Sequence, residues 1–310
     1  MHKIKYSVIV PHFNDAARLH RLLQSIPSSR DDIEILVVDD CSTKMSELTR
    51  IQDKWTSVRW MSTMLNSGAG AARNLGLSFA SGEYIIFSDS DDLFAPSAFE
   101  IFDEYVSNQE LIYFLADGVQ EIDGSRSGRA DKFNHLVKRF SDSNSYPDLI
   151  ELKLGHVVPW AKVYSRSFLI RTGIKFDEVR VADDIAFNVM AALQANRISA
   201  VSKVVYITFR RTGSITSNYN LSTILAEVDV LSNLNLSITL KGLPWRMGAG
   251  GCFARSLSLG AKDAFILIHH MYKRNLILPT IFRFSLRGFF GFLLRLRRES
   301  VELRRNAFLK

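Results

Sequence analysis

Three carboxylates follow directly on an apolar stretch in residues 85–94, IIFSDSDDLF. Asp89, Asp91 and Asp92 repel one another and lose hydration at the end of a buried strand unless a cation neutralises them. In an extended chain Asp89 and Asp91 point to the same side. Mg²⁺ and Mn²⁺ prefer oxygen ligands and often take one or two carboxylates together with phosphate oxygens. The stretch, with Ser90 inside it, therefore predicts a metal that carries a nucleotide diphosphate; a helix cap would explain one carboxylate at most.

Two further groups have the chemistry to meet such a ligand. Asp39 and Asp40 end an apolar, strand-like run and can accept from a nucleobase or a ribose hydroxyl, although aspartates also cap helices. Gly68 and Arg73 lie in NSGAGAARN (66–74), which lacks the third glycine of a dinucleotide-binding loop. It still places a glycine-rich helix start beside a cation, which suits an anionic ligand, while a tight turn would account for Gly68 equally well.

The elements that must position these residues alternate between strand and helix. Such repeated units favour a parallel sheet with helices on both faces, whose ligands bind beyond the carboxyl ends of the strands. We therefore predict an α/β fold with a Rossmann-like, mostly parallel sheet flanked by helices. The expected strands are 6–10, 33–40, 58–63, 84–89 and 111–118, and the expected helices are 15–26, 46–54, 70–82 and 97–107.

The pattern loosens from about residue 121 into polar sequence rich in Gly and Ser. From about residue 221 onward it is helical throughout, which places a boundary within 215–222. Between these two regions the expected elements are a helix over 159–171, a helix over 183–196 and an extended segment over 198–211.

Two more clusters complete the candidate chemistry. Asp183 and Asp184 begin an expected helix, where carboxylates are common for dipole reasons alone. They become candidates for a general base if a sugar hydroxyl must be deprotonated nearby. Arg210 and Arg211 lie at the end of the expected extended segment and suit the developing charge of a leaving diphosphate.

The residues that several other kinds of site require are missing from the sequence. The histidines have no zinc spacing, and the chain has neither a P-loop nor a G-x-S-x-G elbow. Cys41 and Cys252 form no disulfide framework, which suits a reducing compartment. Two alternatives stay open. A sugar-phosphate nucleotidyltransferase should have a Gly-rich loop after the first strand, where PHFND stands, and a non-catalytic nucleotide-sugar-binding module would not need Asp184.

The chain resembles family 2 inverting glycosyltransferases of the GT-A fold, in particular those of bacterial surface polysaccharide assembly. The resemblance covers about residues 4–217. It implies transfer of a hexose or N-acetylhexosamine from a nucleotide diphosphate, a UDP-sugar, to a hydroxyl of a glycan or lipid-linked glycan, with Mn²⁺ or Mg²⁺ as cofactor. The segments that carry it, in the family's order, are SVIVPHFND, EILVVDDCST, NSGAGAARNLGLSFASGEYIIFSDSDDLF, PWAKVYSRSFL and ADDIAFN.

The resemblance also implies roles for individual residues. The catalytic residues would be Asp184 and Asp183, the latter where the family commonly has Glu; either could be the general base, and the second position fits the family's pattern. Asp91 would bind metal with Asp89 and Asp92. Residues 1–217 would form the catalytic domain, with nucleotide binding in 1–120 and the acceptor in 121–217, followed by a helical, basic region over 218–310. The nucleotide-binding residues would be Pro11, Phe13, Asn14, Asp15, Asp39, Asp40, Asn66, Gly68, Arg73, Asp89, Ser90 and Arg211, and Trp160 and Lys162 would lie on the acceptor side.

The formal charge of +7 is concentrated near the C-terminus. Arginines there alternate with an apolar stripe of helical spacing, which predicts a helix in the membrane interface. We therefore expect a cytoplasmic enzyme, without a signal sequence or spanning helix, held peripherally on the inner face of the cytoplasmic membrane and with no nucleic-acid partner. Packing on the catalytic domain or within a homo-oligomer is the alternative. The stripe is Phe282, Leu286, Phe289, Leu293 and Leu296.

Overall fold

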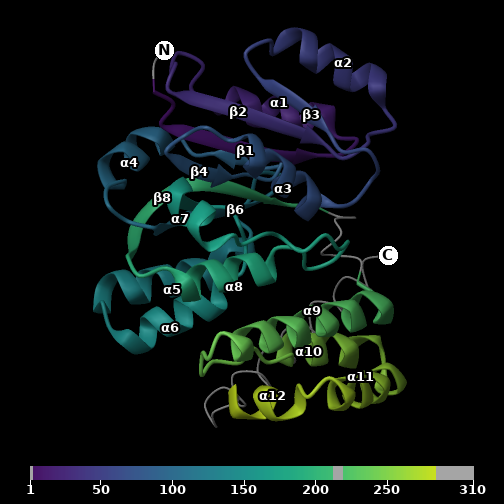
Figure 1. Cartoon of the computed structure of the whole chain (residues 1–310). Coiled ribbons are helices and arrows are strands. Elements are labelled where there is room, and N and C mark those ends of the chain that lie inside the picture. Colours follow the sequence, from purple (N-terminus) through teal and green to yellow (C-terminus); the bar gives the residue numbers. More distant parts are fainter. Residues whose placement is uncertain (1–2, 212–218, 284–310) are drawn as a thin grey trace. The chain divides into compact units, whose positions relative to one another are not determined.

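The computed structural model of the chain describes residues 3–211 and 219–283. The chain divides into two compact units, Met1–Ser214 and Ile215–Lys310. The first unit is built of strands and helices, and the second of helices (Figure 1).

One eight-stranded sheet forms the centre of the first unit, in the order β3-β2-β1-β4-β7-β6-β8-β5. The first four strands in that order are parallel, as expected. Strand β7 is antiparallel to both β4 and β6, whereas β6 is parallel to β8 and β5 is antiparallel to β8, so this half of the sheet is mixed. The strands are β1 (Tyr6–His12), β2 (Ile33–Asp39), β3 (Arg59–Ser62), β4 (Tyr84–Phe87), β5 (Leu93–Phe94), β6 (Leu111–Gln120), β7 (Lys162–Ser165) and β8 (Ile198–Arg210).

Helices cover both faces of this sheet, as predicted. Alternate residues of the central strands enter opposite cores: Val8, Val10 and Ile86 belong to one buried cluster, and Ile9 and Ile85 to the other. Strands that are buried on both faces appear in the sequence as continuous apolar runs, which is why β1 and β4 could be predicted. The helices are α1 (Ala16–Gln24), α2 (Met45–Lys54), α3 (Ala69–Phe79), α4 (Ala98–Tyr105), α5 (Asp131–Ser143), α6 (Tyr146–Gly155), α7 (Arg166–Thr172) and α8 (Ile185–Gln194), with a short 3₁₀ turn at Gly128–Ala130.

The helix expected over 159–171 is wrong in its first half. Residues 162–165 form β7, which is inserted between β4 and β6, and the helix α7 begins only at Arg166. Val163 and Tyr164 are buried in this strand. A short apolar run can be strand or helix, and here the partner strands on both sides decided.

Two helices in the polar region after residue 121 were not foreseen. Helix α5 ends at Ser143 and is followed by Asn144, which adopts a left-handed conformation (φ 45°); Ser145 then caps α6 by accepting from the backbone N–H of Asp148. The sequence SDSNSYPD is therefore the joint between two helices.

The second unit is helical, as the pattern after residue 221 indicated. Asn220 opens its first helix with a capping box shared with Thr223. Among the described residues, no helix combines the length and apolarity needed to cross a membrane. Most of the predicted interfacial stripe, from Leu286 to Leu296, lies outside the described residues. The helices are α9 (Leu221–Leu240), α10 (Gly250–Leu259), α11 (Ala261–Lys273) and α12 (Ile277–Arg283).

Candidate active site

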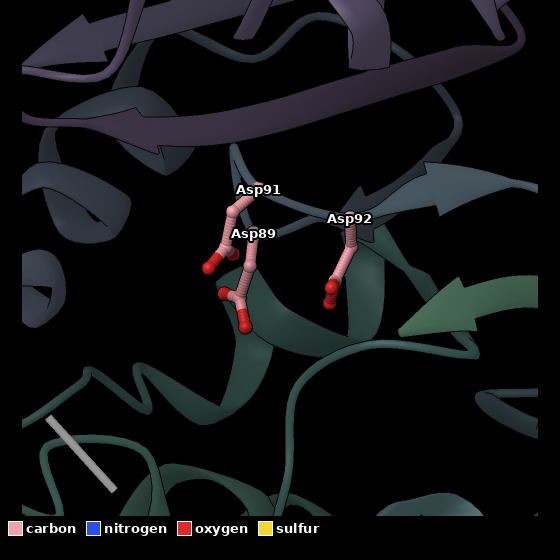
Figure 2. Close-up of side chains that lie close together, drawn as sticks. All are labelled: Asp89, Asp91 and Asp92. Atoms are coloured by element: carbon pink, nitrogen blue, oxygen red, sulfur yellow. The ribbon is translucent and has the colours of Figure 1, made fainter. Parts of the chain in front are cut away.

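The acidic turn after β4 brings three carboxylates to one point. Asp89, Asp91 and Asp92 each offer an oxygen within 4.8 Å of those of the other two (Figure 2). The turn is held by Tyr206 of β8, whose hydroxyl accepts from the backbone N–H of Asp89 at 3.0 Å. Ser90 is half-buried between the first two aspartates. The residues thus form an all-oxygen donor set at the end of a buried strand.

Two observations test whether this set fits a divalent cation. Asp92 is fully buried; its Oδ1 accepts from the backbone N–H of Phe209 at 2.9 Å, while its Oδ2 has no partner among the described residues. Burial, together with the neighbouring carboxylates of Asp89 and Asp91, raises the pKa of Asp92 well above its usual value, and burial and Asp89 likewise raise the pKa of Asp91. A cation would relieve this repulsion and fill the empty acceptor position, so the residues fit Mg²⁺ or Mn²⁺.

Arg73 joins the acidic turn to the predicted base. Its buried guanidinium donates to Asp89 Oδ1 at 2.6 Å and to Asp183 Oδ2 at 2.8 Å. Gly70, one turn earlier on α3, permits this approach, because a Cβ there would lie 2.1 Å from the carbonyl oxygen of Asp177. Arg73 was predicted on the nucleotide side, and that role stays a prediction; the structure shows it spanning the two acidic clusters.

Asp184 lies half-buried at the start of α8. Burial, reinforced by the adjacent Asp183 carboxylate and opposed by Arg73, raises the pKa of Asp184 to about 7. Burial also raises the pKa of Asp183, although Arg73 pairs with it directly. Because Asp183 is engaged in that ion pair, Asp184 is the carboxylate of the two that is poised to exchange a proton near neutral pH.

The carboxylates after β2 hold loops together. Asp40 accepts from the hydroxyl of Thr63 and from the backbone N–H groups of Ser67 and Gly68, at 2.7 to 2.9 Å. Gly68 has a positive φ of 93°, a conformation that glycine adopts without strain, and in this conformation its N–H lies close to the carboxylate. Asn66 in turn donates to the carbonyl of Asp40 at 3.1 Å. These groups were predicted to meet the nucleotide; the structure shows them holding the loops after β2 and β3 together, and the nucleotide contact stays a prediction.

The loop after β1 is fixed in the same way. The side-chain oxygen of Asn14 accepts from the backbone N–H groups of Thr43 and Lys44, and Asp39 accepts from the backbone N–H of Ser42 at 2.9 Å. Pro11 is buried in β1, whereas Phe13 is 46% exposed. Of the predicted nucleotide-binding residues in this loop, Phe13 has an exposed aromatic ring, which is available to stack on a ligand.

A chain of ion pairs that sequence reasoning missed borders the acidic turn. Arg211 reaches Asp15 at 3.2 Å and Asp91 at 3.3 Å. Arg18 binds Asp15 and Glu121, each at 2.6 Å. Arg21, one turn further along α1, donates to the backbone carbonyl of Asp91 at 3.0 Å and contacts Glu121. The i, i+3 spacing of Asp15, Arg18 and Arg21 was the available signal, because it places them on one face of α1.

Trp160 and Lys162, predicted on the acceptor side, are both buried. Trp160 stacks on Tyr206 with ring centroids 5.6 Å apart, beneath the acidic turn. Lys162 donates to the carbonyl of His156 and to Asn188. In this structure neither side chain is exposed to a ligand.

The model of the family "Glycosyl transferase family 2" matches residues 7–173, which is more than half of the chain. The chain belongs to this family. Its fold is that of GT-A glycosyltransferases, as expected. Residues outside the match include Asp183, Asp184 and Arg211, whose placement therefore comes from the structure.

Curated relatives of this family member are bacterial glycosyltransferases. It is 28% identical over 70% of its length to a cholesterol galactosyltransferase of Borreliella burgdorferi, covering 63% of that protein. It is 29% identical over 68% of its length to the Staphylococcus aureus poly(ribitol-phosphate) β-N-acetylglucosaminyltransferase TarS, covering 36%. The chain thus spans between about a third and two thirds of the length of these relatives.

Solved structures resemble the chain over most of its length. Residues 1–349 of S. aureus TarS, in complex with UDP, are 25% identical with a TM-score of 0.56, over 81% of this chain and 69% of that one. The same protein with UDP-GlcNAc gives a TM-score of 0.59 at 24% identity, over 85% of this chain and 75% of that one. A Pyrobaculum calidifontis mannosyltransferase with GDP-mannose and Mn²⁺ gives 0.52 at 16% identity, over 97% and 87%, a likeness of fold alone.

Proposed function

We propose that the protein is an inverting glycosyltransferase that moves a sugar from a UDP-sugar to a hydroxyl of a glycan or lipid-linked glycan in bacterial surface polysaccharide synthesis. The observation that carries the proposal is the bridge made by Arg73. Its guanidinium binds Asp89 of the acidic turn and also Asp183, which directly precedes Asp184, the carboxylate with a pKa of about 7. Leaving-group stabilisation and proton abstraction need these two features on either side of one reacting carbon.

The residues have separate tasks in this reaction. The exposed ring of Phe13 stacks on the nucleobase. Arg211, which pairs with Asp91, meets the diphosphate. Asp184 takes the proton from the acceptor hydroxyl as its oxygen forms the new bond to the anomeric carbon. The bond from that carbon to the phosphate oxygen breaks on the opposite face, and its electron pair leaves with UDP. One such displacement inverts the anomeric centre.

Asp91, Asp89 and Asp92 would hold the Mn²⁺ or Mg²⁺ cofactor. When bound, this ion supplies positive charge against the leaving diphosphate. The relatives transfer a galactosyl and an N-acetylglucosaminyl group, which supports a hexosyl or N-acetylhexosaminyl donor for this chain.

Isothermal titration and a donor panel test the proposed function. Titration with UDP is run with Mn²⁺ and with EDTA, and UDP-, GDP- and dTDP-sugars are then screened for metal-dependent hydrolysis and for transfer to added glycans. Release of UDP from a UDP-sugar supports the glycosyltransferase. Binding without turnover on any donor and acceptor would indicate a binding module, and formation of a nucleotide sugar from UTP and a sugar phosphate would indicate a nucleotidyltransferase.

The rate should depend on pH through Asp184. The base must be ionised to accept a proton, so kcat/KM for the UDP-sugar is expected to rise through pH 7, where the raised pKa of Asp184 lies. Below that pKa the ionised fraction, and with it the rate, falls about tenfold per pH unit. The check is a pH profile at saturating Mn²⁺, with UDP binding measured at each pH. A rate that stays flat between pH 5.5 and 8 while UDP binding also stays constant contradicts Asp184 as the base.

We also propose that the enzyme contacts the inner face of the cytoplasmic membrane peripherally. Helix α11 supports this independently of the predicted tail. Phe265 and Tyr272, seven residues apart on one side of the helix, are 74% and 72% exposed, and the exposed Lys262 and Lys273 flank them. An aromatic stripe bordered by cations suits the surface of anionic lipid.

Vesicle binding should therefore depend on α11. The double variant Phe265→Ser, Tyr272→Ser is expected to sediment less with phosphatidylglycerol vesicles than the parent protein at low salt, and to keep its UDP affinity. Ile170→Ser, which removes an exposed apolar side chain of α7, is the matched control. Equal sedimentation of parent and double variant would reject this surface, and a change in oligomeric state instead would assign it to contact between subunits.

A further inference from the structure

Lys162 is a fully buried amine without a carboxylate partner among the described residues. Its Nζ donates to the carbonyl oxygen of His156 and to Asn188 Oδ1, both at 2.7 Å, and lies 4.9 Å from the ring centroid of Tyr113. Burial lowers the pKa of Lys162 well below its usual value, and Asp184 opposes this. A buried amine is costly unless its donors are satisfied. An apolar side chain of the same length would avoid that cost. What lysine adds at this position, and an apolar residue lacks, is the two hydrogen bonds that its amine donates.

Asn188, on α8, connects Lys162 to the candidate active site. Its Oδ1 accepts from Lys162 Nζ and from the hydroxyl of Tyr164 at 2.8 Å. Because the two acceptor positions of Oδ1 are filled, the amide has one orientation, in which Nδ2 donates to the backbone carbonyl of Asp184 at 2.8 Å. Without the amine, the hydroxyl of Tyr164 is the remaining donor of this pair to Oδ1, and the amide and its bond to Asp184 are held less firmly.

The carbonyl of Asp184 thereby receives two donors. The backbone N–H of Asn188 binds it at 3.1 Å in the ordinary helical way, and Nδ2 of the same residue adds a second bond. The segment that enters the helix is strained, because Ala182 has a positive φ of 59°. The Asp184 side chain makes no capping bond of its own to the helix, so the position of its carboxylate follows from where its backbone is held.

We propose that Lys162 is a positioning residue for proton abstraction: through Asn188 it fixes the first turn of α8 and so holds the Asp184 carboxylate against the acceptor hydroxyl. This rests on the proposed function, in which Asp184 is the base. It replaces a direct contact of Lys162 with the acceptor, which burial forbids in this structure. It links PWAKVYSRSFL and ADDIAFN, which are separate in sequence: the first supplies the amine, and the second supplies the amide and the proposed base.

The test is a double-mutant cycle with Lys162→Met, which removes the donors and keeps an unbranched chain. The readouts are kcat for metal-dependent hydrolysis of the UDP-sugar that the donor panel identifies, and the Kd of UDP with Mn²⁺. Lys162→Met is expected to lower kcat by about tenfold to a hundredfold, since small displacements of a catalytic group have effects of this size, and to leave the Kd of UDP within about twofold. In an Asp184→Asn background the same change should lower kcat no further, because its effect acts through the missing base.

Lys153→Met is the matched control. Lys153 is a partly buried lysine of α6 that donates to the carbonyl of Ala195 at 3.3 Å, away from Asp184. Its replacement should leave kcat and the Kd of UDP unchanged. Circular dichroism and thermal unfolding establish that each variant is folded. If Lys162→Met is not recovered folded, Asn188→Ala takes its place in the cycle with the same expected outcomes.

The outcomes separate this inference from the proposed function. A folded Lys162→Met or Asn188→Ala protein with the parent kcat overturns the inference while leaving the glycosyltransferase intact. An equal further loss in the Asp184→Asn background also overturns it, because the lysine then acts independently of the base. A fully active Asp184→Asn protein removes the proposed base itself, and the inference with it.

Discussion

Asp184→Asn should lower the turnover of the UDP-sugar by about a hundredfold or more, the usual contribution of a general base. The amide keeps the size of the carboxylate but cannot accept the acceptor proton. The effect should fall on kcat, because in the proposed mechanism Asp184 meets the acceptor hydroxyl while the nucleotide binds at the acidic turn. The measurement is kcat for transfer or hydrolysis, together with the Kd of UDP in the presence of Mn²⁺, which should barely move.

Asp183→Asn is the informative comparison for this variant. Asp183 is engaged by Arg73 at 2.8 Å, so its neutralisation should disturb the bridge and the affinity for the metal more than the proton transfer. If Asp183→Asn abolishes turnover while Asp184→Asn is mild, the base is the preceding residue. The two carboxylates are adjacent and both have raised pKa values, so the pair of variants has to be read together.

Asp91→Ala should abolish metal-dependent binding of UDP while leaving the fold intact. The variant removes one of three oxygens that lie within 4.8 Å of one another, and it also releases Arg211, which pairs with Asp91 at 3.3 Å. One change thus weakens both the binding of the proposed metal ion and the placement of Arg211. Titration of UDP with Mn²⁺ should give no measurable heat for the variant, whereas its thermal unfolding should resemble that of the parent.

The control for Asp91→Ala is Asp123→Ala, which removes a carboxylate from an exposed loop where it binds Ser125. This variant should bind UDP like the parent. EDTA added to the parent protein should reproduce the loss seen in Asp91→Ala. Undiminished UDP binding in EDTA would show that the acidic turn does not work through a metal.

The first half of the sheet could be predicted from the sequence because its information is local. Strands β1 and β4 are buried on both faces and read as apolar runs, and each is followed by polar residues at its carboxyl end. The rule that parallel strands present their carboxyl ends at one edge then placed Asp40 and Asp91 on the same rim. The spacing of Asp89 and Asp91 pointed to a cation in the same local way.

The second half of the sheet followed from pairing between distant segments. Residues 162–165 have no pattern that separates strand from helix, and only the flanking β4 and β6 made them a strand. That insertion buries Lys162 and turns a predicted acceptor contact into an internal donor. Sequence periodicity carries no information about which strands become neighbours.

By itself, the sequence determined the kind of chemistry: an acidic turn after a buried strand, a second acidic pair at a helix start, and arginines at positions 73, 210 and 211. Only the tertiary structure decided the connections among them. Arg73 meets Asp89 and Asp183 because Gly70 lets α3 approach the segment before α8. The pKa of Asp184 is raised to about 7 because folding removes it from water and sets it beside Asp183. Burial and charge–charge distance exist only in the folded chain, whereas residue type and strand-end position are already present in the sequence.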